Sequence, residues 1–136
     1  MNWIKGGDKV ILRIDFDSET PIYVQIRNQV IEGIAKSEIE IGEELPSVRA
    51  LAEDIGVNMH TVNKAYNILK DEGYIKIDRR KGAVVSLNLN QSSEKFKAEL
   101  DENLYFYMAE CFNRNIDKED IKKYIDKVFM DFSKGE

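Results

Sequence analysis

The side chains with the clearest chemistry lie in residues 58–70, where amide, cationic and methyl-bearing groups alternate with apolar positions. The apolar positions recur at the spacing of one buried helical face, formed by Val62, Ala65, Tyr66 and Leu69. Helix geometry then turns the remaining side chains outward: Met59, His60, Asn63, Lys64 and Asn67. Asparagine pairs with adenine through two hydrogen bonds, lysine reaches guanine or phosphate, and the methyl groups of Met59 and Thr61 suit a thymine methyl. This pattern favours a helix that reads the DNA major groove over a merely solvated helix face.

A second cationic group, Arg79-Arg80-Lys81, precedes Gly82 and joins two strand-like segments, residues 74–77 and 83–87. The chain carries a net charge of -5, yet residues 57–87 hold six basic and three acidic side chains, a local balance of +3. Cations at a hairpin tip beside a reading helix are typical of phosphate binding or entry into the minor groove, and the alternative is a solvated turn. We therefore expect a polyanion to be met in this part of the chain.

Five elements are predicted to position these side chains. They are a strand over residues 10–16, a helix from Pro21 to about Lys36 capped by Ser18 or Thr20, a helix that Ser47 caps and Gly56 ends, a helix that Asn58 caps and Gly73 ends, and the basic hairpin. Residues 41–46 read as a connecting turn. Only Gly56-Val57-Asn58 separates the second helix from the third, which is the spacing of a helix-turn-helix. A helix-turn-helix followed by a basic hairpin predicts a winged helix.

A polar connector over residues 88–93 predicts a domain boundary, with a winged-helix domain over 1–90 and a helical domain over 91–136. Two amphipathic helices follow it, the first capped by Ser92 or Ser93 and the second by Asp117. Their apolar stripes are Phe96, Leu100, Leu104, Tyr107, Met108 and Cys111 in the first helix, and Ile121, Tyr124, Ile125, Val128, Phe129 and Phe132 in the second. A hairpin this small cannot bury both stripes by itself, so we expect these residues to form a homodimer interface.

Several other classes of protein are disfavoured. One cysteine, Cys111, and one histidine, His60, make neither an intramolecular disulfide nor a Cys/His zinc cluster, and Cys111 reads as a packed thiol. The sequence offers no nucleophile–base set and no phosphate loop, so we expect neither an enzyme nor a bound cofactor or metal. No apolar run approaches the length of a membrane helix, and the first residues lack the apolar core of a signal peptide. These features predict a cytoplasmic protein without membrane contact.

Residues 21–87 resemble the winged-helix domain of the GntR family of bacterial transcription regulators. The resemblance rests on PIYVQI at 21–26, GEELPSVRALA at 42–52, GVN at 56–58, TVNKAY at 61–66 and EGYI at 72–75. These motifs occur in the order and spacing of the family and cover about half of the chain. The short two-helix tail and the sequence at residues 57–58 and 61–66 are similar to those of the YtrA-like subfamily.

The resemblance implies roles for individual residues. It places Arg49 of the second helix against DNA, with an ion pair to Glu53 as the alternative. It places the following residues at reading positions of the third helix: Asn58, Met59, His60, Thr61 and Asn63. It also places Gly82 at the wing tip. The chain differs from many members at Met59 and Asn63, where they have arginine, and at Ala50, where a capping glutamate is frequent.

The sequence therefore predicts an α+β protein, an N-terminal winged helix-turn-helix followed by a short two-helix dimerisation hairpin. We expect a homodimeric, sequence-specific transcription regulator, a repressor that binds an inverted-repeat DNA operator. The alternative is a winged-helix module that binds proteins and never touches DNA, which would fit the acidic total charge. A small-molecule effector, if there is one, is expected at the dimer interface near Tyr107, Cys111, Tyr124 and Phe129.

Overall fold

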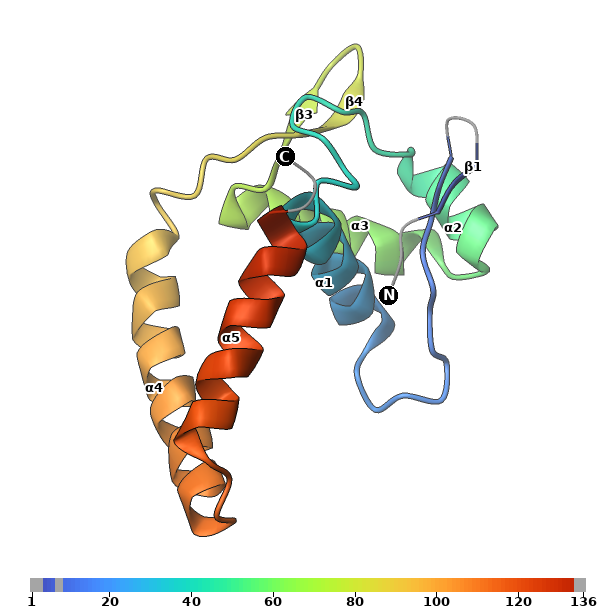
Figure 1. Cartoon of the computed structure of the whole chain (residues 1–136). Helices are drawn as coiled ribbons and strands as arrows, with labels where there is room; N and C mark the ends of the chain where they lie inside the picture. Colours follow the sequence, from blue (N-terminus) through green and yellow to red (C-terminus); the bar gives the residue numbers. More distant parts are fainter. Residues whose placement is uncertain (1–3, 7–8, 134–136) are drawn as a thin grey trace.

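The computed structural model describes residues 4–6 and 9–133 and has the order of elements of a winged helix followed by two helices (Figure 1). The elements are β1 (Ile4–Gly6), β2 (Lys9–Ile11), α1 (Ile22–Ala35), α2 (Val48–Ile55), α3 (Met59–Glu72), β3 (Ile75–Asp78), β4 (Gly82–Val85), α4 (Ser93–Asn113) and α5 (Lys118–Ser133). β1 pairs with β2 and β3 with β4, both antiparallel. The predicted fold class is confirmed.

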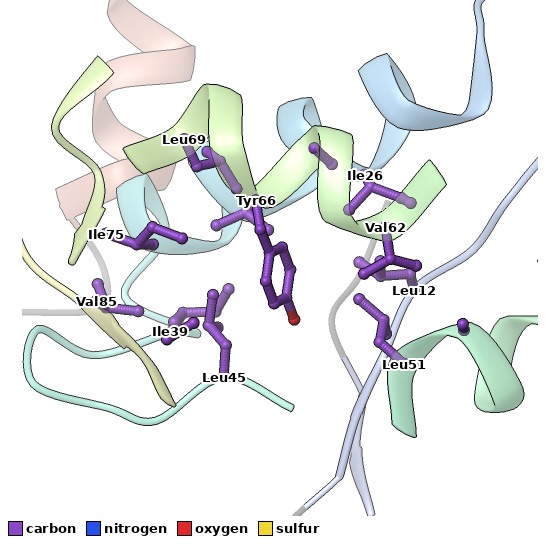
Figure 2. Packing of buried hydrophobic residues seen from close by; sticks show 14 residues of the cluster. Leu12, Ile26, Ile39, Leu45, Leu51, Val62, Tyr66, Leu69, Ile75 and Val85 are labelled. Atoms are coloured by element: carbon purple, nitrogen blue, oxygen red, sulfur yellow. The ribbon is translucent and has the colours of Figure 1, made fainter. Parts of the chain in front are cut away.

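The hydrophobic core lies where α1, α2 and α3 meet the hairpin of β3 and β4. Val62, Ala65, Tyr66 and Leu69 are all buried, as their helical spacing predicts. Figure 2 shows Tyr66 reaching from α3 toward Leu45, and its hydroxyl donates a hydrogen bond of 2.8 Å to the carbonyl of Pro46. α3 is thus packed along one whole side, which leaves its opposite side free to present polar groups.

The helix-turn-helix has the caps that the sequence predicts. Ser47 Oγ accepts from the Ala50 N–H at 3.1 Å, and Asn58 Oδ1 accepts from the His60 N–H at 2.7 Å. Gly56 ends α2 with φ 71°, a left-handed conformation that glycine adopts without a steric penalty. These side-chain acceptors satisfy N–H groups at the helix starts that have no partner within the helix.

The wing is broader than two strands. Its ladder pairs Ile75 with Val85 and Asp78 with Gly82, so each strand lies within two residues of its predicted bounds. Residues 42–45, predicted as a connecting turn, run along the other side of β4, where the Leu45 N–H donates to the Ala83 carbonyl at 2.8 Å. This pairing gives β4 a neighbour on both edges and fixes the base of the wing.

The predicted strand over residues 10–16 is wrong beyond Ile11, where β2 ends. No strand of the described chain lies beside the next residues, and two buried glutamines of α1 take its place. Gln29 exchanges two hydrogen bonds with the backbone of Arg13, at 3.1 and 2.6 Å, and Gln25 exchanges two with Asp15, both 2.9 Å. Side-chain amides mimic peptide groups, so the segment is held against α1 without forming a ladder. Phe16, the last residue of the predicted strand, is 62% exposed.

The start of α1 also differs from the prediction. Pro21 occupies the cap position itself, outside the first helical turn, and no side chain caps the helix. The Ser18 hydroxyl accepts from the Thr20 N–H at 3.1 Å instead, and the Thr20 carbonyl accepts from the Gln25 side chain at 2.8 Å. Proline at the cap has no N–H that needs a partner, and its carbonyl accepts from the N–H groups of Val24 and Gln25 at 3.0 and 3.1 Å.

The start of α4 is bound tightly to the end of α3. Ser92 occupies the N-cap position of α4, but its side chain forms no cap bond. The hydroxyls of Ser92 and Ser93 donate to the carbonyls of Glu72 and Leu89 at 2.8 and 2.6 Å. Gly73 has φ 96°, and a Cβ there would lie 1.9 Å from the Asn88 carbonyl oxygen. The Asn88 N–H in turn donates to the Gly73 carbonyl at 2.9 Å. The segment predicted as a polar connector is therefore bonded to residues 72–73 at several atoms.

The two C-terminal helices diverge from the turn that joins them (Figure 1). Asp117 caps α5 as predicted, since its carboxylate accepts from the Glu119 N–H at 2.9 Å. No residue of either helix is buried in the described chain. No helix of the described residues is long and apolar enough to cross a membrane.

Candidate nucleic-acid interface

The outer face of α3 carries the side chains predicted to read bases. Asn63 and Asn67 are exposed, and within the described part of the chain neither carboxamide is engaged in a hydrogen bond. Met59 and His60 are exposed beside them, and Thr61 is half-buried. Asn58 is exposed too, but its carboxamide oxygen already caps α3. Its NH₂ group remains available, so Asn58 offers donors without the acceptor that adenine pairing needs.

Lys64 lies apart from the asparagines. Its ammonium nitrogen is 4.0 Å from the centre of the Tyr23 ring, a cation–π contact between α3 and the first turn of α1. The sequence indicated Lys64 as a groove contact and did not predict the role of Tyr23. The PIYVQI motif contains this tyrosine, but its contact with Lys64 depends on how α1 crosses α3.

The wing tip is built on Asp78, a second residue that the sequence reading did not single out. Its carboxylate accepts from the N–H groups of Arg80 and Lys81 at 2.8 and 3.1 Å, and these bonds lower the pKa of Asp78. Gly82 completes the turn with φ 78°. An aspartate at the first position of a tight turn is the local signal that sequence alone offers for this arrangement.

The basic side chains around this turn are free to meet an anion. Arg79, Arg80 and Lys81 are exposed, and none of them forms an ion pair in the described structure. Arg49 is exposed on α2, and the alternative ion pair with Glu53 is absent from the described chain. Tyr66 fixes the segment before α2 through its hydroxyl, and burial raises the pKa of that hydroxyl. The start of α2, which carries Arg49, is thus tied directly to α3.

One acidic residue of this region is neutralised inside the fold. Glu72, the last residue of α3, binds Arg27 of α1 through two hydrogen bonds of 2.7 and 2.6 Å. This bidentate contact is the main cause that raises the pKa of Arg27, and it joins the end of α3 to α1. The carboxylate of Glu72 is therefore paired with a cation, whereas that of Asp78 keeps its negative charge and is held by backbone N–H groups of the wing turn.

The residues predicted to form a dimer interface share one property: none is buried in this chain. Cys111, Ile121, Val128 and Phe132 are half-buried, and the other eight predicted residues are exposed. Phe132 lines a hollow of about 460 Å³ together with residues at the end of α1, including Ile34, and with Leu87. The described residues contain no group of three His, Cys, Asp or Glu that could hold a metal ion.

Comparison with known proteins identifies relatives of the whole arrangement. Residues 22–85 match the model of a family described as bacterial regulatory proteins, gntR family. The chain is 33% identical to the HTH-type transcriptional repressor YtrA of Bacillus subtilis over 126 residues, which is 92% of this chain and 97% of the relative.

Two solved structures extend the likeness to three dimensions. YtrA from Sulfolobus acidocaldarius, a GntR-family transcription factor, is 46% identical with a TM-score of 0.62, covering 73% of this chain and 98% of that one. A transcriptional antiterminator from Listeria monocytogenes is 31% identical with a TM-score of 0.78, covering 90% of this chain and 92% of that one. The likeness therefore reaches beyond the winged helix into the two C-terminal helices.

Proposed function

Because the chain belongs to the gntR family of bacterial regulatory proteins, and is thus a DNA-binding transcription regulator rather than an enzyme, we propose that it is a homodimeric repressor of an inverted-repeat operator. The predicted resemblance to YtrA-like members is confirmed by the relatives from Bacillus and Sulfolobus. One observation carries the proposal. The described chain combines exposed amide and basic side chains on α3 and the wing with apolar stripes on α4 and α5 in which no residue is buried.

Base reading is assigned to the exposed face of α3. Asn63 and Asn67 present carboxamides whose donors and acceptor are both available, the requirement for a two-bond contact with adenine. Met59 and Thr61 supply methyl groups for thymine contacts, and His60 and Asn58 supply donors near the helix start. The discrimination among base pairs belongs to these residues.

Backbone binding is assigned to residues around this face. Arg49 approaches a phosphate from α2, and Arg79, Arg80 and Lys81 approach the backbone or the minor groove from the wing, with Gly82 allowing the tip to come close. Such contacts set the position of the protein on DNA and carry no sequence information of their own. They also give this part of the protein a local positive charge, which attracts DNA although the net charge of the whole chain is negative.

Dimerisation is assigned to α4 and α5. Exposed aromatic and aliphatic side chains that recur along two diverging helices cost free energy in water, and a second copy that supplies the same stripes removes that cost. The two-fold symmetry of such a dimer requires two related half-sites in opposite orientation. The half-sites are then bound together, and linkage raises affinity without any new contact.

The sign of regulation is proposed from a relative. The Bacillus subtilis protein, which this chain covers almost end to end, is named a repressor, and this supports repression here. An effector site, where one exists, is placed among Tyr107, Cys111, Tyr124 and Phe129. A ligand at the dimer interface changes the spacing of the two winged helices only if it binds one spacing better than the other.

The test is to select bound fragments from random double-stranded DNA with the purified full chain. We expect an inverted repeat, retention that weakens steeply with salt, and a mass from light scattering that corresponds to two chains. An enriched single half-site bound by one chain would contradict the dimer. Retention of no DNA at any salt concentration would favour the protein-binding alternative.

A further inference from the structure

We propose that Tyr23 positions Lys64 to bind a DNA phosphate, so that Lys64 does not read a base edge. This inference deepens the proposed function and depends on α3 lying in the major groove. Sequence alone leaves both roles of Lys64 open, because a lysine side chain reaches either guanine or phosphate. The position of the ammonium group decides between them.

The first argument is the place of Lys64 around α3. At 3.6 residues per turn, Asn63 and Asn67 project about 40° from each other, whereas Lys64 projects about 100° from Asn63. The buried residues of α3 place the midline of its exposed face between Asn67 and Lys64. The two carboxamides lie on one side of that midline and Lys64 lies on the other, so the ammonium group and the carboxamides leave the helix in different directions.

The second argument is the direction in which Lys64 points. Its ammonium nitrogen lies 4.0 Å from the centre of the Tyr23 ring, so the side chain leans toward α1 and away from the carboxamides. Tyr23 is half-buried and belongs to the set of residues packed against the core, which keeps the ring in place. The ring thus holds the cation beside the first turn of α1, apart from the carboxamides that are proposed to read bases.

The third argument is the charge around the ammonium group. The first turn of α1 contains no acidic residue, and Lys64 forms no ion pair with another described residue. The start of a helix carries a partial positive charge, so a lysine beside it adds to a positive field, and no described carboxylate is paired with the ammonium group. An incoming phosphate satisfies both charges, while the ring keeps the lysine ordered in its absence.

The experiment compares full-length variants on the selected operator and on operators with single base-pair changes, each over a series of salt concentrations. Lys64→Gln is expected to weaken every sequence by the same factor and to flatten the plot of log affinity against log salt by about one unit. Tyr23→Leu is expected to weaken all sequences several-fold with unchanged base preference, and to have no further effect when Lys64→Gln is already present. Tyr23→Phe keeps the ring and is expected to restore the affinity that Tyr23→Leu loses.

Asn63→Ala serves as the matched control, since it is expected to change base preference and keep the salt slope. Altered preference at one base pair with an unchanged slope in Lys64→Gln would overturn the proposal, because Lys64 would then read that base. An equal loss from Tyr23→Leu with and without Lys64 would overturn the role of Tyr23. Lys64 is exposed, so its variant tests the phosphate role even if Tyr23→Leu disturbs the packing of α1. Failure of the unmodified chain to bind any DNA would instead overturn the proposed function.

Discussion

The winged helix and the C-terminal helices contain similar apolar residues, but these are buried in the first region and exposed in the second. In the winged helix, Ile26, Val62 and Leu69 are completely enclosed by segments far apart in sequence. In α4 and α5, Leu104 is 48% exposed and Tyr124 is 68% exposed, although both lie on regular apolar stripes. The difference shows that an amphipathic pattern specifies a face to be covered and leaves open which surface covers it.

Polar contacts follow the same division. The winged helix is fixed by contacts between distant residues, such as the Arg27–Glu72 pair and the backbone bonds of Gln25 and Gln29. The ion pairs of the C-terminal helices, such as Arg114 with Glu110, join neighbours on one helix and are solvent-exposed. Exposed pairs of that kind contribute little to stability. Within the described chain the winged helix is therefore held by its own long-range contacts, whereas α4 and α5 have only local ones, and we expect these two helices to depend on a partner.

The largest expected effect separates the two regions outright. Deleting all residues after Asn90 is expected to leave a folded monomer, because the core lies entirely within residues 12–85. Its affinity for a full operator should fall by about 10² to 10⁴, the gain that linked half-sites provide. Light scattering and fluorescence anisotropy measure both quantities. On an isolated half-site the truncated and full chains should bind alike, and a truncated chain that stays dimeric would refute the assignment of the interface.

A pair of leucines tests the comparison at single positions. Leu69→Ala, at a fully buried site, is expected to lower the free energy of unfolding by about 2–5 kcal/mol at any protein concentration. Leu104→Ala is expected to change it mainly through dimer dissociation, so its effect should depend on concentration. Urea unfolding followed by circular dichroism at two concentrations distinguishes them. A loss from Leu104→Ala that ignores concentration would mean that α4 packs within one chain.

Within the winged helix, reading and anchoring residues can be separated. Asn63→Ala is expected to cost about 1–3 kcal/mol at the preferred operator and to lose discrimination at particular base pairs. Arg80→Ala should weaken all sequences nearly equally and flatten the salt dependence by about one unit. Lys123→Ala, an exposed cation on α5, is the charge-matched control and should change neither. Unchanged base preference in Asn63→Ala would show that the assigned face of α3 is wrong.

The smallest effect concerns the wing tip and pH. Hydrogen bonds from Arg80 and Lys81 hold the pKa of Asp78 below its ordinary value of 3.8. The turn is therefore stabilised at neutral pH by the ionised carboxylate, and this contribution is lost only as the pH falls through the lowered pKa. The amide resonances of Arg80 and Lys81 should move in that range in an NMR titration. In Asp78→Asn the movement should vanish, and its persistence would point to another group.

Local signals predicted the helix-turn-helix well. Ser47 and Asn58 cap their helices, Gly56 and Gly73 end theirs, and Val62 lies in the core, because each depends on residues within one turn of itself. The same is true of the exposed face of α3, since helical spacing determines which side chains point outward. The candidate site could thus be located from sequence before any packing was known.

Features that depend on distant segments were not predictable in this way. The alternation over residues 10–16 is typical of a strand, but buried glutamines of α1 bind that segment and no strand forms there. The pairing of residues 42–45 with β4 and the contact of Lys64 with Tyr23 likewise require knowledge of how elements cross. The bonds of Ser92 and Ser93 were not predictable either: the Ser92 hydroxyl donates to the Glu72 carbonyl at the end of α3, and the Ser93 hydroxyl donates to the Leu89 carbonyl in the connector.

The close approach at Gly73 has a mechanical consequence for the whole molecule. α3 ends just before Gly73, and β3 begins two residues after it. The backbone of Asn88 lies so close to Gly73 that a side chain at this position would have no room. α4 begins five residues after Asn88, and the Ser92 hydroxyl donates to the carbonyl of Glu72, the last residue of α3. These contacts join the end of α3 to the start of α4. We therefore expect a change in the tilt of α4 to be transmitted directly to α3.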